Sequence, residues 1–112
     1  MIQPEQRKFR RHEARHLLNY LTIDGDGNPG TYSMGRTLDV CVDGLRLETI
    51  QPLHTDTRLR ITLGVEGNLI DLEGRTTHSS PSENRYISGV SFLRVSKDGR
   101  RTLNKYIEAL PN

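Results

Sequence analysis

Two short segments carry the side chains best suited to binding chemistry. Residues 6–11 read QRKFRR, and residues 39–44 read DVCVDG. A guanidinium presents five N–H donors in a planar fork, which can bridge two phosphate oxygens or grip the edge of a base, and lysine cannot make that fork. The second segment adds a carboxylate, a thiol and a glycine. The arginines therefore favour an anionic ligand, and the turn offers acceptors beside it.

The two segments together resemble the signature of the PilZ domain, a family of small β-barrel receptors for the bacterial second messenger cyclic di-GMP. That signature is R-x-x-x-R followed by D/N-x-S-x-x-G, and Arg7, Arg11, Asp39 and Gly44 match it. Residues 35–49 have the family's strand, turn and strand texture, and residues 87–92 resemble its last barrel strand. The resemblance covers about the whole chain. It implies a mainly β fold, a six-stranded antiparallel barrel with a C-terminal α-helix.

The resemblance also implies a ligand and its contacts. Cyclic di-GMP carries two phosphodiester charges and two guanines, whose O6 and N7 atoms accept from arginine. Asp39 would accept hydrogen bonds from guanine N–H groups, and Gly44 would permit a positive φ or a close approach of the ligand. The implied ligand-binding residues are Arg7, Arg10, Arg11, Asp39, Cys41 and Gly44.

Two positions depart from the family pattern. Gln6 stands where many members have a first arginine, and Cys41 replaces the usual serine, although a thiol is a weaker donor than a hydroxyl. These departures support an alternative function, a protein-interaction module of the same fold, related to pili or motility, that does not bind cyclic di-GMP. Retention of the arginine pair, Asp39 and Gly44 favours the receptor.

The register of the arginines has two readings. Arg7 and Arg11 give R-x-x-x-R, whereas Arg10, Arg11 and Arg15 give R-R-x-x-x-R. We prefer the first reading, because the distance from Arg11 to the apolar segment Leu17 to Ile23 then suits the family better. Arg15 would lie at the start of that segment, where a solvated side chain is ordinary.

Composition limits the other possibilities. With 112 residues and a 33% hydrophobic fraction, the chain can form one domain with a modest core. Residues 5–16 hold a surplus of three positive charges, while the whole chain is only +2. A local positive potential favours one compact anion over a nucleic-acid track, and the arm lacks the stacking aromatics usual in single-strand binders. We therefore expect no nucleic-acid partner and an unidentified effector protein downstream.

The single cysteine excludes an internal disulfide, and no signal peptide or membrane span is evident. We expect a cytoplasmic protein without membrane insertion, either a monomer or a ligand-dependent dimer. Residues 1–15 are expected to form a flexible basic arm, and residues 16–112 the barrel domain with its helix.

Hydrophobic periodicity predicts the elements. Apolar residues alternate or cluster in six strand-like segments, and from residue 96 to about 110 they recur at helical spacing after Ser96, a suitable N-cap. Residues 24–30 and 79–84 read as polar loops. The predicted strands are Leu17 to Ile23, Tyr32 to Val40, a segment around Leu45 and Leu47, Leu59 to Val65, Leu69 to Thr77, and Arg85 to Val95.

Three further motifs are similar to metal-binding or catalytic patterns, but each lacks residues that such a site requires. Residues 12–16 spell H-E-x-x-H, but they lie between a charged arm and a strand, without a plausible third zinc ligand. Residues 24–28 begin like a calcium loop, yet Pro29 and Gly35 occupy the positions that need glycine and glutamate. Cys41 has no histidine or carboxylate at a diagnostic spacing. We therefore predict a protein that is not an enzyme and holds no metal or cofactor.

Overall fold

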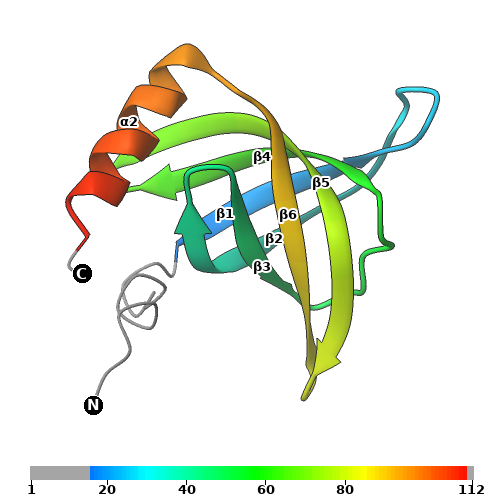
Figure 1. The fold of residues 1–112 in the computed structure, drawn as a ribbon. Helices are drawn as coiled ribbons and strands as arrows, with labels where there is room; N and C mark the ends of the chain where they lie inside the picture. The colour runs from blue at the N-terminus through cyan, green and yellow to red at the C-terminus, as the bar shows by residue number, and fades with distance from the viewer. Residues whose placement is uncertain (1–15, 111–112) are drawn as a thin grey trace.

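The computed structural model describes residues 16–110, and in it six antiparallel strands close into a barrel (Figure 1). Neighbouring strands follow the order β1-β2-β3-β6-β5-β4, and β1 pairs with β4 to complete the closure. The predicted fold is confirmed. The strands are β1 (Leu17–Ile23), β2 (Pro29–Cys41), β3 (Gly44–Thr49), β4 (Arg58–Val65), β5 (Asn68–Ser82) and β6 (Arg85–Val95).

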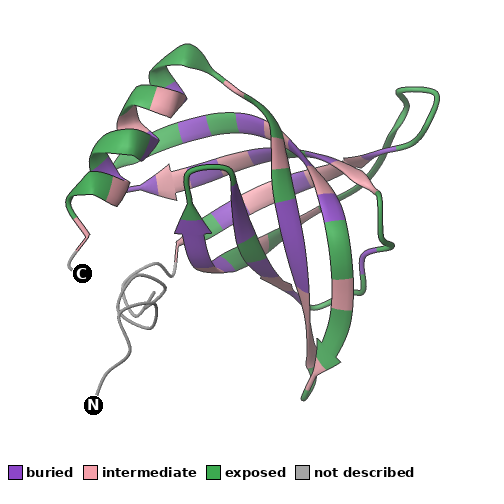
Figure 2. Ribbon diagram, in the orientation of Figure 1, coloured by how far each residue is buried: buried purple, intermediate pink, exposed green. Residues whose placement is uncertain are grey.

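The barrel interior is filled by alternate residues of each strand, as the striped colouring in Figure 2 shows. In β4, four side chains have no exposed surface, and the residues between them face outward. Successive side chains of a strand point to opposite faces, so one apolar set serves the core while the other face stays polar. The four buried residues are Leu59, Ile61, Leu63 and Val65.

Among the described residues one helix, α2 (Lys97–Glu108), packs beside β5 and β4 (Figure 1). Its N-cap is Ser96, whose Oγ accepts a hydrogen bond from the backbone N–H of Gly99 at 3.1 Å. Leu103 and Tyr106 are buried in the same cluster as the barrel core. The predicted amphipathic helix is therefore the element that extends the core beyond the strands.

The predicted polar loop over residues 79–84 is wrong. Strand β5 continues to Ser82, and its residues 79–82 pair with residues 85–88 of β6 around a tight turn in which Glu83 has a φ of +56°. Most of this extension is exposed or half-buried. Because neither face needs an apolar row there, the hydrophobic alternation that indicates a strand is missing from the sequence.

Strand β2 begins earlier than predicted, at Pro29, and this residue pairs with Ile23 of β1 across the hairpin. Within the turn, Asp24 Oδ1 accepts hydrogen bonds from the backbone N–H groups of Asp26 and Asn28, both at 2.9 Å. This is ordinary turn chemistry for an aspartate. The carboxylate therefore organises a hairpin, as expected from the sequence.

Candidate ligand-binding site

The D-x-C-x-x-G segment forms the tight connection between β2 and β3. Cys41 and Gly44 are the last residues paired across the two strands, so Val42 and Asp43 form the turn itself. The Asp43 carbonyl accepts a hydrogen bond from the Phe92 N–H of β6 at 2.9 Å, and the Val42 carbonyl accepts one from Arg100 of α2 at 2.6 Å. The turn is thus held by a strand and by the helix.

Gly44 is required by close packing inside the protein. Among residues 16–110 only Gly27 and Gly67 are glycines with a positive φ, so Gly44 does not use the conformation that the sequence suggested as one option. A Cβ at this position would lie 2.6 Å from the Val90 carbonyl oxygen of β6. The glycine therefore lets β3 approach β6, and this approach positions the turn.

A cavity of about 290 Å³ opens beside the turn. It brings together three of the predicted site residues, Asp39, Cys41 and Gly44, with residues from β3, β5 and β6. Sequence reasoning did not single out the other contributors, of which three lie in or directly after the motif and four come from β5 and β6, which are remote in the chain. These are Asp43, Leu45, Arg46, Thr77, Gly89, Val90 and Ser91.

Asp39 is 8% exposed and forms an ion pair with Arg46, whose Nε donates to Asp39 Oδ2. Arg46 alternates with the core residues Leu45 and Leu47, so it points to the outer face, where about half of its side chain is exposed. A guanidinium has five donors. The pair therefore offers both cationic donors and carboxylate oxygens at the edge of the cavity.

Cys41 is exposed and lines the cavity. Its Sγ lies 3.3 Å from the Gly44 carbonyl and 3.6 Å from Asp43 Oδ1. Partial burial, reinforced by the neighbouring Asp43 carboxylate, raises the pKa of the thiol above its ordinary value. A nucleophilic cysteine needs the opposite shift. The shift therefore favours the protonated thiol over a nucleophilic thiolate.

The arginines of the arm, Arg7, Arg10 and Arg11, lie outside the described residues. The described chain begins at His16, which is fixed to the barrel by two hydrogen bonds with Thr37: His16 N–H donates to Thr37 Oγ1 at 2.9 Å, and Thr37 N–H donates to the His16 carbonyl at 2.8 Å. The His16 ring lies 2.9 Å from the Tyr106 hydroxyl of α2. Thr37 precedes Asp39 by two residues, so the first described residue is held on the strand that leads into the turn.

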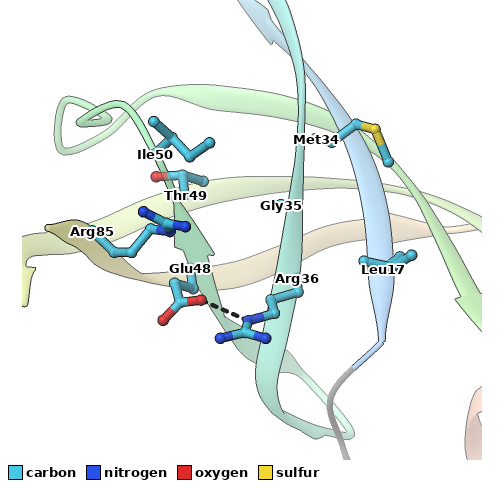
Figure 3. Close-up of a pocket in the computed structure, with 8 residues that line it drawn as sticks. All are labelled: Leu17, Met34, Gly35, Arg36, Glu48, Thr49, Ile50 and Arg85. Carbon is cyan, nitrogen blue, oxygen red and sulfur yellow. Dashed lines mark hydrogen bonds and ion pairs between the residues drawn. The ribbon is translucent and has the colours of Figure 1, made fainter.

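A second cavity, of about 270 Å³, lies on the outer surface of β1, β2 and β3 (Figure 3). Its rim is largely apolar, with Leu17, Met34 and Ile50 exposed. Its Arg36 and Glu48 form an ion pair at 2.6 Å, drawn as the dashed line in Figure 3. Both cavities contain an arginine–carboxylate ion pair, and the cavity beside the D-x-C-x-x-G turn is the candidate because it brings together the predicted site residues Asp39, Cys41 and Gly44.

The family model for the PilZ domain matches residues 5–109, and the chain belongs to that family. PilZ domains are generally receptors for cyclic di-GMP and are non-catalytic, so the prediction that the chain is not an enzyme is confirmed. Within residues 16–110 no group of three or more histidine, cysteine, aspartate or glutamate side chains could hold a metal ion.

Several solved structures share the fold. MrkH from K. pneumoniae in its apo state is 18% identical, with a TM-score of 0.69 over 98% of this chain and 51% of that one. The Bacillus subtilis inhibitor of motility, MotI/DgrA, is 12% identical, with a TM-score of 0.68 over 96% and 51%. The PilZ domain of Escherichia coli YcgR with c-di-GMP is 18% identical, with a TM-score of 0.62 over 88% and 82%.

The chain therefore spans about half the length of MrkH and of MotI/DgrA. No curated protein matches the sequence. In the part of the chain that the structure describes, no helix is both long enough and apolar enough to cross a membrane.

Proposed function

We propose that this chain is a cytoplasmic receptor for cyclic di-GMP that uses the cavity beside the D-x-C-x-x-G turn together with the arginine arm. The observation that carries the proposal is the convergence, in one cavity, of Asp39, Cys41 and Gly44. Membership of the PilZ family supplies the ligand class. In this proposal the arginine arm folds over the dinucleotide, starting from His16.

The roles of the groups follow from their chemistry. Arg7 and Arg11 donate to phosphate oxygens or to guanine O6 and N7, and Arg10 adds charge beside them. Asp39 accepts from guanine N–H groups, with Arg46 holding the carboxylate in place. Cys41 presents its thiol to the same ligand. Closure of the arm then creates a new surface for an effector protein.

A competition experiment tests both the site and its base specificity. Labelled cyclic di-GMP bound to the protein should be displaced by unlabelled cyclic di-GMP and not by cyclic di-AMP, because adenine lacks the O6 acceptor and the N–H donors that suit Asp39. Asp39→Asn removes the charge but keeps the shape, and binding should weaken by at least about tenfold. Arg36→Gln, which removes a comparable ion pair elsewhere on the barrel, serves as the matched control.

Equal displacement by the two dinucleotides would remove guanine recognition from the proposal. Failure of the labelled dinucleotide to bind the folded protein would favour the alternative, a PilZ-fold protein-interaction module. One observation supports that alternative: a thiol, which is a weak donor, occupies the exposed edge of the cavity at Cys41.

A further inference from the structure

A groove of about 480 Å³ opens on the outer surface of β4, β5 and β6, where these strands meet the start of α2. It shares no residue with the cavity beside the D-x-C-x-x-G turn. Leu72 and Val95, which pair across β5 and β6, supply its apolar part. Its other lining residues are Arg60, Thr62, Asp71, Glu73, Arg94, Ser96 and Lys97.

The groove contains two arginines organised around one carboxylate. Arg94 donates to Glu73 Oε1 at 2.8 Å, and Arg60 lies 4.0 Å from Glu73 Oε2. The hydrogen bond from Arg94 is the main reason that the pKa of Glu73 is lowered, with further contributions from the charges of Arg58 and Arg60. Glu73 therefore stays ionised and holds guanidinium groups from two different strands.

Both guanidinium groups remain largely open to solvent. The Arg94 and Arg60 side chains are 75% and 62% exposed, while Glu73 is 18% exposed. Each guanidinium has five donors, and one carboxylate engages only part of this set. Because Glu73 orients the arginines in advance, a second carboxylate would meet donors already in position, at a lower entropic cost of ordering them.

Charge in the groove is unbalanced. Arg60, Arg94 and Lys97 line it against Asp71 and Glu73, and Arg58 adds its charge close to Glu73. Asp71 is engaged within the protein, because its Oδ1 accepts a hydrogen bond from Thr62 Oγ1 at 3.0 Å. The surplus is positive, so the groove complements an acidic partner.

We propose that this groove is a docking surface for an acidic segment of a partner protein, one in which carboxylates alternate with apolar side chains. The carboxylates of the partner segment bind Arg60, Arg94 and Lys97, and the apolar side chains of the same segment contact Val95. A protein segment fits better than a nucleic acid, because Asp71 and Glu73 would repel a continuous row of phosphates. No aromatic side chain is available for stacking among the groove's lining residues.

The test is an NMR titration of the isotope-labelled protein with a short synthetic peptide in which glutamate and leucine alternate. Backbone amide shifts should centre on Glu73 and on residues 94–97. The double variant Arg60→Gln, Arg94→Gln should bind at least about fivefold more weakly, as expected for two partly exposed charge contacts. Arg36→Gln, a matched control outside the groove, should change the affinity by less than about twofold. A peptide with glutamine in place of glutamate should cause no shifts in the groove.

Several outcomes would overturn the proposal. These are shifts confined to the arm or to residues 39–46, unchanged affinity in the double variant, or equal binding of the glutamine peptide. A single-stranded DNA oligonucleotide that binds the groove more tightly than the peptide would assign it to nucleic acid instead. If the double variant does not fold, Lys97→Gln at an exposed helix position provides the same comparison. The titration contains no cyclic di-GMP, so its result is independent of the proposed function.

Discussion

At the scale of single residues, Cys41 is the clearest departure from the family pattern. Its thiol lies at the exposed edge of the cavity, not in the barrel interior. Cys41→Ser replaces a weak donor with a hydroxyl, so the affinity for cyclic di-GMP should rise by about 0.5–1.5 kcal/mol, the usual net value of one hydrogen bond. Because the side chain is exposed, the free energy of unfolding should change little. Paired titration and melting of this variant measure both quantities, and a loss of stability without a gain in affinity would contradict the placement.

The arginines of the arm carry the charge recognition. Arg11→Ala should weaken cyclic di-GMP binding by at least about tenfold, since a hydrogen bond to a charged group contributes about 1.5–3 kcal/mol. Thermal stability should be nearly unchanged, because the arm precedes the barrel. Arg7→Ala and Arg15→Ala, measured in the same way, decide the register: a larger loss of affinity in Arg15→Ala would show that the preferred register is wrong.

Sequence alone could identify the part of the site that is contiguous in the chain. Asp39, Cys41 and Gly44 lie within six residues, so a short motif captures them. Thr77 and Ser91 reach the same cavity only because β5 and β6 pair beside β3, which no local pattern encodes. Arg46 could have been included among the predicted site residues, because the alternation of Leu45 and Leu47 already placed it on the outer face next to the motif.

At the scale of elements, the approach of β3 to β6 fixes the turn. Gly44→Ala would place a Cβ 2.6 Å from the Val90 carbonyl oxygen, so it should lower the free energy of unfolding by about 1–3 kcal/mol. Gly64→Ala is the matched control, because its Cβ would have no neighbour nearer than the Leu17 carbonyl at 3.8 Å. Denaturant unfolding of both variants tests this reason for the glycine. Equal stability of the two would contradict it.

The contact between the start of β1 and α2 should make stability depend on pH. Burial lowers the pKa of His16 below its ordinary value of about 6.5, although the charge of Glu66 opposes the shift. The folded state therefore binds fewer protons than the unfolded state, and the stability contribution is complete above the unfolded pKa and is lost as pH falls through the folded one. The melting temperature should fall between about pH 7.5 and pH 5.5. His16→Gln should reduce this slope, and an identical slope in the variant would assign the effect to other groups.

The strands and the helix could be predicted from the sequence where one face of the element is buried and the other is exposed. The strict alternation in β4 and the helical spacing around Leu103 and Tyr106 matched the observed strand and helix. The same reasoning failed for residues 79–82, because both faces of this hairpin extension are largely exposed to solvent and its sequence has no hydrophobic alternation. Element boundaries therefore follow burial, and the sequence reveals them only where burial is one-sided.

At the scale of the whole molecule, the described residues form a closed barrel that carries the two surfaces proposed here for binding. The cavity beside the D-x-C-x-x-G turn and the groove of Arg60 and Arg94, beside the start of α2, share no lining residue. The helix contacts the turn through Arg100, which donates to the Val42 carbonyl, and contacts the first described residue, His16, through Tyr106. This arrangement suits a receptor in which one surface takes the ligand and another takes a partner.

Calorimetric titration of the whole chain with cyclic di-GMP tests the central claim most directly. The account predicts saturable binding with a defined stoichiometry, either one dinucleotide per chain or an intercalated pair. The affinity should fall steeply with added salt, because charged groups dominate recognition. Absence of heat and of competition at concentrations where the folded protein is intact would contradict the account.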